Sequence, residues 1–238
     1  MEIIIIGSDG QLGKCIQDQV NKVETKSNFL FCSRLDLDIS DHEKTNKFLR
    51  KFSPDIIINA SGYTNVDLAE KNIKNADAIN NYAVGNLANI ANKIDATLLH
   101  ISTDYVFNGK SSCPYSEIEP TDPLGVYGKT KLSGEQAIIL SGCKYIIIRT
   151  SWVFSEYGNN FLKSILKLIS ERESISVVND QLGCPTYAQD IAKLLIEFIS
   201  KIKKGNFFKE ILHFSGDKQT SWFEFANKIY DEKKKYVE

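Results

Sequence analysis

The 238-residue chain is long enough for one large domain or one and a half ordinary ones, and its 42% apolar and 25% charged residues are typical of a globular protein with a buried core. Its net charge of −1 argues against nucleic acid as a partner, and no apolar stretch approaches the length of a membrane span. Five cysteines without a Cys-x-x-Cys pair, and an apolar start of only four residues, favour a reducing, cytoplasmic location.

Short apolar runs alternate with longer amphipathic stretches through the first 150 residues. The expected strands are apolar throughout, which is typical of a parallel sheet covered by helices on both faces. They are Ile3–Ile6, Phe29–Cys32, Ile56–Asn59, Thr97–Ile101 and Tyr145–Thr150, with helices expected near residues 11–20, 41–52, 76–93 and 126–140. This alternation predicts an α/β fold with a doubly wound parallel sheet of the Rossmann type.

The pattern loosens after about residue 150. Helical stretches fit residues 159–172, 188–202 and 221–235, and a loop with Asp180, Gly183 and Pro185 separates the first two. We therefore expect a dinucleotide-binding region over residues 1–154 and a smaller C-terminal substrate-binding lobe over residues 155–238. The ligand cleft is expected between that lobe and the carboxyl ends of the strands.

A glycine loop follows the first predicted strand directly, with Gly7, Gly10 and Gly13 in the spacing G-x-x-G-x-x-G. Glycine allows the tight turn and lets the backbone approach a pyrophosphate, and a helix that begins near Gln11 points its free amides at the phosphates. A plain turn between strand and helix is the alternative. The position of the loop, between an all-apolar strand and a helix, favours a dinucleotide site.

The end of the second predicted strand bears on the choice of cofactor. Arg34 follows it, and no acid occurs before Asp36. An arginine there accepts a 2′-phosphate, whereas an acid binds the ribose hydroxyls, so NADP is favoured and NAD remains the alternative. The alternative interpretation of Arg34 is that it is a solvated loop residue without a role in binding. Asp38 lies where a loop could reach the adenine, unless Ser40 or Asp41 simply caps the next helix.

A Y-x-x-x-K pattern occurs twice, at Tyr127 with Lys131 and at Tyr230 with Lys234. About one such pair is expected by chance in a chain of this composition, so the pattern alone means little. The second copy is interpreted as an ordinary helix pair. The first begins a helix between two predicted strands, where spacing i, i+4 places both side chains on one face.

That first pair has the chemistry of a proton donor for a ketone. A phenol titrates near pH 10, and a neighbouring ammonium stabilises the phenolate, so we expect Lys131 to lower the pKa of Tyr127. Reaching neutrality requires about 3 pKa units, or ~4 kcal/mol. Thr103 follows the strand Thr97–Ile101 and faces the same crevice, where it could hydrogen-bond the reacting oxygen, although strand-end capping is the alternative.

At these residues the chain resembles the extended short-chain dehydrogenase/reductases and, within them, the dTDP-4-dehydrorhamnose reductase family. Several motifs spread along nearly the whole chain carry the resemblance and are together far more specific than any one of them. They are the glycine loop with Gln11 and Leu12, the run 35–41, the run 59–67 with Ala69 and Glu70, the run His100–Phe107, the run Arg149–Phe154 and the run Asp180–Thr186.

The resemblance implies reduction, with NADPH, of the C4 ketone of a dTDP-linked 4-keto-6-deoxy sugar, the last step of dTDP-L-rhamnose synthesis. It implies a catalytic set, a cofactor set and a substrate set. These are Thr103, Tyr127 and Lys131 for catalysis; Gly7, Gly10, Gln11, Leu12, Gly13, Asp38, Ile39, Ala60, Tyr63 and Thr64 for the cofactor, with Tyr127 and Lys131 on the ribose side; and Asp104, Tyr105 and Trp152 for the sugar.

Three departures from the family pattern stand out. Ser61 replaces a common alanine. Cys15 occupies a position where some relatives carry a glutamate that joins subunits through magnesium, so no metal is expected here, although a homodimer stays open. Relatives usually continue into a segment with an Arg-Pro pair that this chain lacks, so we expect either a truncated chain or an incomplete substrate lobe.

Two other functions remain open at this point. A nucleotide-sugar epimerase of the same superfamily would hold NAD tightly, and a non-catalytic regulatory subunit like that of methionine adenosyltransferase would bind NADP without needing the catalytic set. The intact Thr103, Tyr127 and Lys131 favour the reductase. The three histidines have no zinc-ligand spacing, and His100, on a buried strand, is expected to be a packed core residue.

Overall fold

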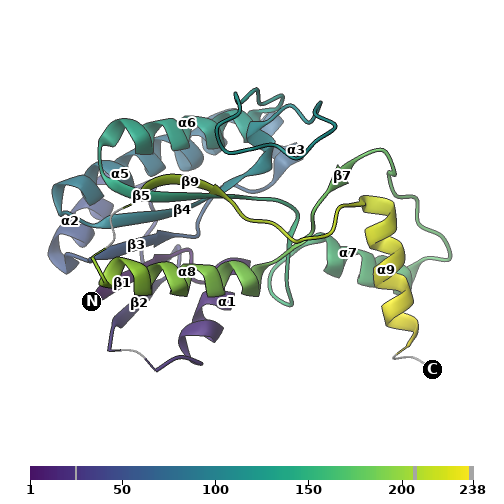
Figure 1. The fold of residues 1–238 in the computed structure, drawn as a ribbon, viewed down its shortest axis with the longest axis horizontal. Coiled ribbons are helices and arrows are strands. Elements are labelled where there is room, and N and C mark those ends of the chain that lie inside the picture. The colour runs from purple at the N-terminus through teal and green to yellow at the C-terminus, as the bar shows by residue number, and fades with distance from the viewer. Residues whose placement is uncertain (25, 206–207, 236–238) are drawn as a thin grey trace.

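Six parallel strands form the central sheet, in the order β2-β1-β3-β4-β5-β9 (Figure 1). The computed structural model describes residues 1–24, 26–205 and 208–235. The strands are β1 (Glu2–Ile6), β2 (Asn28–Cys32), β3 (Ile56–Asn59), β4 (Thr97–Thr103), β5 (Lys144–Thr150) and β9 (Lys209–His213). The chain leaves β1 on one side for β2 and returns on the other for β3, so the predicted doubly wound sheet is confirmed.

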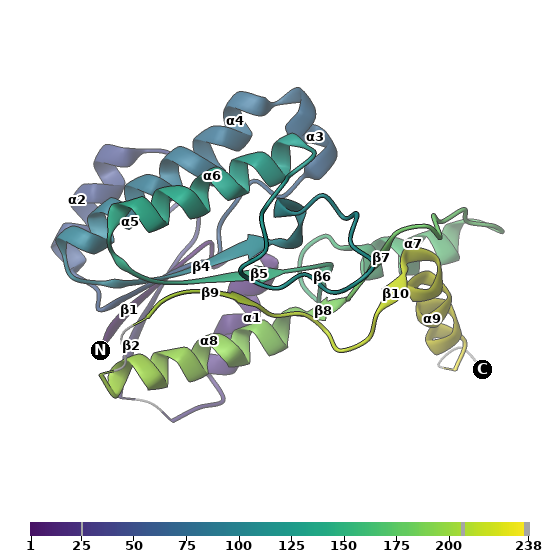
Figure 2. The ribbon, with the colours of Figure 1, turned by 45° about the horizontal axis from the view of Figure 1, so that its top comes forward.

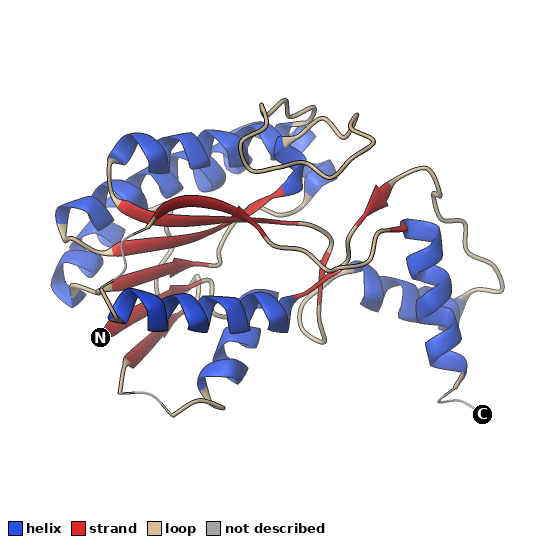
Figure 3. Cartoon of the chain, in the orientation of Figure 1, coloured by secondary structure: helices blue, strands red, loops and turns tan. Residues whose placement is uncertain are grey.

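Helices cover both faces of this sheet, as Figure 3 shows by its blue helices on either side of the red strands. Successive residues of a strand point to opposite faces, so an all-apolar strand serves two cores. Ile4, Ile57 and Leu98 belong to the core on one side, and Ile3 and Ile56 to the core on the other. The first side is covered by α2 (His42–Phe52), α5 (Val84–Lys93) and α6 (Val126–Ser141), and the second by α1 (Gln11–Val20) and α8 (Ala188–Lys203).

The helix expected near residues 76–93 is built from several pieces. It comprises α4 (Ile73–Asp77), a π-helical turn η1 (Ala78–Ala83) and α5, and the short helix α3 (Val66–Lys71) precedes it. A Cβ on Gly134 of α6 would lie 2.1 Å from the Asn80 carbonyl oxygen. The π-helical turn therefore packs backbone to backbone against the helix that carries the Y-x-x-x-K pair. Figure 2 shows the neighbouring helices α4 and α5 beside α6.

A smaller lobe stands beside the sheet, at the right of Figure 1. It contains α7 (Phe161–Glu171) and α9 (Trp222–Lys234), which share a core around Ile165 and Ile229. Two short strand pairs link it to the sheet lobe: β6 (Val153–Phe154) with β8 (Thr186–Tyr187), and β7 (Leu182–Gly183) with β10 (Thr220–Ser221).

The structure divides residues 155–238 differently from the sequence-based boundary. Helix α8 packs against α1, and its Ile191 and Leu195 lie in the same core as Ile3, so this helix belongs with the sheet. Strand β9 extends the sheet beyond β5. The small lobe therefore holds only the segments before and after α8 and β9, because the apolar face of α8 is buried on the sheet.

Within the described ranges of the chain, no helix is both long and apolar enough to cross a membrane.

Candidate active site

The glycine loop lies at the carboxyl end of β1 and forms a tight cradle. Gly7 has a left-handed conformation (φ +84°) that favours glycine, and its amide donates to the Cys32 carbonyl at 2.9 Å. A Cβ on Gly13 would lie 2.3 Å from the Gly7 carbonyl oxygen, so no side chain fits between the loop and the first turn of α1. Gly10 is the N-cap of α1 and leaves the first amides without a side-chain cap. The cradle has the form that a pyrophosphate needs.

The two residues after Gly10 have different surroundings. Leu12 is buried in the core beneath α1. The Gln11 side chain donates to the Val153 carbonyl at 3.2 Å and accepts from Asn160 at 2.6 Å. Asn160 caps α7, so Gln11 joins the glycine loop to the small lobe, and its backbone is the part that is free to meet a phosphate.

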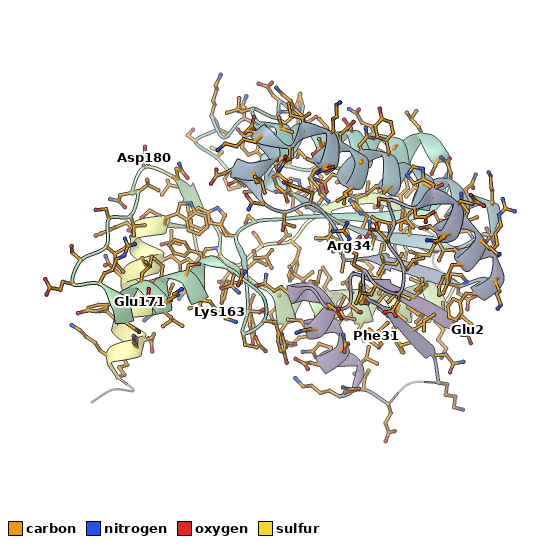
Figure 4. All side chains as sticks on the ribbon, turned by 180° about the vertical axis from the view of Figure 1, so that it is seen from behind. Glu2, Phe31, Arg34, Lys163, Glu171 and Asp180 are labelled. Atoms are coloured by element: carbon orange, nitrogen blue, oxygen red, sulfur yellow. The ribbon has the colours of Figure 1, made fainter. Side chains whose placement is uncertain are left out.

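Arg34 and Asp38 lie together beyond the end of β2. Their side chains form an ion pair at 3.1 Å, and the Arg34 side chain is 77% exposed. Figure 4 shows Arg34 on the large lobe, whereas Lys163, Glu171 and Asp180 lie on the small one. Asp38 also accepts from the Ser40 amide and hydroxyl, which lowers the pKa of Asp38. Asp41, not Ser40, caps α2. Ile39 is buried in the core, with 5% exposure.

The loop that follows β3 is held by one buried amide from the π-helical turn. Asn80 accepts from the Tyr63 amide at 2.8 Å and donates to the Tyr63 carbonyl at 3.0 Å. The same Asn80 donates to Thr130 of α6 at 3.2 Å. The segment from Ala60 to Thr64 is thereby positioned between the glycine loop and the helix that carries Tyr127.

Thr103 and Tyr127 meet at the carboxyl end of β4. Burial raises the pKa of Tyr127 to about 12, and a hydrogen bond with the Thr103 side chain acts in the opposite direction. Tyr105 lies edge-on to Tyr127, with ring centroids 5.5 Å apart. A Cβ on Gly128 would lie 2.1 Å from the Tyr105 carbonyl oxygen, so this glycine lets α6 bring Tyr127 up to the strand end. Glu70 accepts from the Val126 amide at 2.7 Å and caps the same helix.

Lys131 shares the helix face with Tyr127 but contacts other groups. Its Nζ donates to the Ile101 carbonyl at 2.6 Å and lies 3.1 Å from His100 Nε2. Burial lowers the pKa of Lys131 to about 8, and Glu135, one turn further along, acts to raise it. The expectation that Lys131 lowers the pKa of Tyr127 therefore differs from the structure, in which burial dominates and the lysine amine points to β4.

The residues expected to hold the sugar lie around this point. Asp104 begins the short 3-10 helix η2 (Asp104–Val106), and burial raises the pKa of its carboxyl to about 6, opposed by a hydrogen bond from Thr103. Trp152 follows β5 in a left-handed conformation (φ +48°) and stacks on Trp222 of α9, with centroids 3.5 Å apart. Tyr105 and Trp152 thus follow the carboxyl ends of the neighbouring strands β4 and β5.

A buried ion pair beneath these residues was not predicted. Glu135 of α6 accepts from Arg149 Nη2 of β5 at 2.7 Å, and the two side chains are 1% and 5% exposed. Ser102 donates a short hydrogen bond to Glu135. The one sequence signal was spacing, because Tyr127, Lys131 and Glu135 follow at intervals of four on α6.

One buried hydroxyl at the carboxyl end of β5 has no protein partner in the described part of the chain. Thr150 ends β5 opposite Thr103, and its buried hydroxyl makes no hydrogen bond. A ligand with a polar group at this place would satisfy it, which fits a site for a cofactor head group or a sugar.

No group of three or more His, Cys, Asp or Glu side chains in the described ranges is placed to hold a metal ion. Cys15 lies on α1, and burial raises the pKa of its thiol to about 11.

Comparison with known proteins agrees with this geometry. A family model described as "RmlD substrate binding domain" matches residues 1–238. A dTDP-4-dehydrorhamnose reductase of Aggregatibacter actinomycetemcomitans is 41% identical over 231 residues, which are 97% of this chain and 78% of that one. The chain belongs to the dTDP-4-dehydrorhamnose reductase family. The family member of Escherichia coli K12 is 36% identical, with coverage of 99% and 79%.

Solved structures of this reductase family have the same fold. The dTDP-4-dehydrorhamnose reductase of Bacillus anthracis, solved in complex with NADP, aligns with a TM-score of 0.92 at 37% identity and covers 98% of this chain and 80% of its own. A UDP-glucose 4-epimerase of Thermus thermophilus aligns with a TM-score of 0.80 at 15% identity, which shows the fold alone. The curated relatives reported above favour the reductase over the epimerase and the regulatory subunit.

Proposed function

We propose that the protein is an NADPH-dependent oxidoreductase that reduces the C4 ketone of a dTDP-linked 4-keto-6-deoxy sugar, the last step of dTDP-L-rhamnose synthesis. Membership of the reductase family supports this proposal. The single structural observation that carries it is that Thr103 and Tyr127 meet at the carboxyl end of β4, with Lys131 one turn along the helix.

The proposed catalytic set moves one proton. When bound, NADPH supplies the hydride that forms the new C–H bond at C4. The Tyr127 hydroxyl gives its proton to the ketone oxygen, so the product is an alcohol and the phenolate later regains a proton from water. With a pKa raised to about 12, the phenol of Tyr127 is protonated at neutral pH, as a proton donor must be. The Thr103 hydroxyl, which donates to Asp104 in this structure, would turn to donate a hydrogen bond to the same reacting oxygen.

The remaining residues bind and orient. We propose that Gly7, Gly10, Gly13 and the backbone of Gln11 hold the pyrophosphate, with Leu12 beneath them. Asp38 and Ile39 lie on the adenine side, and Ala60, Tyr63, Thr64 and Lys131 on the ribose and nicotinamide side. Asp104, Tyr105 and Trp152 would hold the sugar, and the nucleotide-sugar is the only partner that we propose for the crevice.

Arg34 is proposed to accept the 2′-phosphate of NADP. Its ion pair with Asp38 is exposed, so Arg34→Ala should change the free energy of unfolding by less than about 1 kcal/mol. Loss of one charge-assisted contact is worth roughly 1.5–3 kcal/mol, so NADPH affinity should fall about tenfold or more while NADH affinity changes little. Fluorescence titration with both cofactors measures this difference. An equal loss for NADPH and NADH would assign Arg34 a structural role only.

The activity itself is tested by following NADPH absorbance with dTDP-4-keto-6-deoxy-L-mannose as substrate. Consumption of NADPH in step with alcohol formation supports the proposal. Tight NADPH binding without reduction of any nucleotide-linked keto sugar would favour a regulatory subunit instead.

A cytoplasmic location is proposed on the basis of the cysteines, because all five are free thiols and three of them, Cys15, Cys32 and Cys143, are buried. A homodimer stays a prediction, which sedimentation analysis would test.

A further inference from the structure

A chain of buried hydrogen bonds crosses the carboxyl ends of β3 and β4 and ends at α6. The Ser61 amide and hydroxyl donate to Asn59 Oδ1 at 3.1 and 2.6 Å. Asn59 Nδ2 lies 3.1 Å from His100 Nδ1, and His100 Nε2 lies 3.1 Å from Lys131 Nζ. Asn59 and His100 have no exposed surface and Lys131 is 4% exposed, so water does not offer these groups alternative partners.

The donor-to-acceptor direction of these hydrogen bonds follows from the backbone N–H of Ser61, which can only donate. A backbone N–H only donates, so the Asn59 amide must turn its oxygen to Ser61 and its nitrogen to His100. The amide nitrogen only donates, so His100 Nδ1 accepts. Burial holds the pKa of His100 well below its ordinary value. The ring is therefore neutral and carries its proton on Nε2.

This tautomer turns a ring N–H toward the lysine. An ammonium group has three donors and no acceptor, so it cannot accept from His100. An uncharged amine has a lone pair, which accepts from His100 Nε2 while one N–H donates to the Ile101 carbonyl. The 3.1 Å contact is therefore a satisfied hydrogen bond only when Lys131 is uncharged.

We propose that Asn59 and His100 are positioning residues that favour the uncharged amine of Lys131 by holding His100 in its Nε2–H tautomer. This inference rests on the proposed function only in the cofactor-binding role that it gives to Lys131. Burial of the lysine acts in the same direction, and Glu135 on α6 opposes it, although Arg149 of β5 neutralises Glu135. Further titratable groups on the elements around Lys131 are Tyr127 and Lys129 on α6 and Asp104 and Tyr105 on η2.

The tautomer can be measured directly in the unsubstituted, full-length protein without cofactor or substrate. Nitrogen-15 NMR of the histidine rings distinguishes a protonated from an unprotonated ring nitrogen, and a His100→Gln spectrum identifies the His100 signals among three histidines. We expect a proton on Nε2, none on Nδ1, and no titration of the ring between pH 6 and pH 9. A proton on Nδ1, or a midpoint near the ordinary histidine value of about 6.5, would overturn the proposal.

The variant Asn59→Asp reverses the chain with little change in shape. A carboxylate accepts from His100 Nδ1–H, so Nε2 becomes an acceptor and suits an ammonium at Lys131. Lysine Cε chemical shifts, with the Lys131 signal identified by its loss in Lys131→Met, should give a midpoint about one pH unit or more above the value of about 8. A raised midpoint with the tautomer unchanged would show only the added charge and would contradict the proposal. If this variant does not fold, the His100 tautomer measured in the unsubstituted protein decides whether the proposal holds.

A binding measurement connects this chain of buried hydrogen bonds to the cofactor. The ammonium is lost as the pH rises through the lowered pKa of Lys131, so NADPH affinity should fall by up to tenfold per pH unit above about pH 8. In Asn59→Asp this decline should begin at a higher pH. A general structural defect would weaken binding equally at every pH, and that result would count against a positioning role for Asn59.

Discussion

We expect replacement of Tyr127 by phenylalanine to lower turnover by a factor of about 10²–10⁴, the usual effect of losing a positioned general acid, and to leave folding and NADPH binding intact. The variant removes one hydroxyl and keeps the ring that packs edge-on against Tyr105 at 5.5 Å. Thr103 keeps its hydrogen bonds with Asp104 and the Tyr105 amide in this variant. The rate of NADPH consumption with the keto sugar, measured beside NADPH affinity, separates lost proton transfer from lost binding.

Tyr230→Phe is the matched control. Tyr230 is the first residue of the second Y-x-x-x-K pair, but it lies on α9 of the small lobe, is 41% exposed, and has Lys234 over its ring at 4.3 Å. This substitution should leave turnover nearly unchanged. Equal turnover with phenylalanine at 127 would remove Tyr127 from the catalytic assignment.

We expect replacement of Arg149 by methionine to lower the free energy of unfolding by about 3–5 kcal/mol, because it leaves the buried Glu135 carboxylate without its counter-charge. Three nitrogen–oxygen contacts between 2.7 and 3.2 Å join these side chains, and both are at least nine-tenths buried. The pair ties α6 to β5, so the loss also loosens the helix that carries Tyr127 and Lys131. Urea denaturation followed by circular dichroism measures the change.

Two further variants decide whether burial of the ion pair causes the stability loss expected for Arg149→Met. Lys193→Met breaks the exposed pair with Asp190 at 2.9 Å and should cost less than about 1 kcal/mol. The double variant Glu135→Leu with Arg149→Met removes both charges and should be more stable than Arg149→Met alone. If Arg149→Met lowers the free energy of unfolding no more than Lys193→Met does, the argument from desolvation is refuted.

Apolar patterning was enough to predict most of the sheet. All five strands expected from mainly apolar runs are present, because a strand buried on both faces carries few polar residues, such as Asn59 and His100, to interrupt the run. Strand β9 was missed because it lies at the sheet edge, where Lys209 and Glu210 are exposed and break the apolar run. The π-helical turn was missed for another reason, since its form follows from close packing of Asn80 against Gly134.

By itself the sequence determined the family, the doubly wound sheet and the residues proposed to carry the chemistry, because glycine spacing and strand-end motifs are local patterns. Only the tertiary structure decided what those residues contact. Neighbouring parallel strands place Asn59 beside His100, and α6 brings Lys131 and Glu135 onto β4 and β5. The direction of a hydrogen bond and the cost of a buried charge depend on such partners, which come from distant parts of the chain, and no spacing along the sequence reveals them.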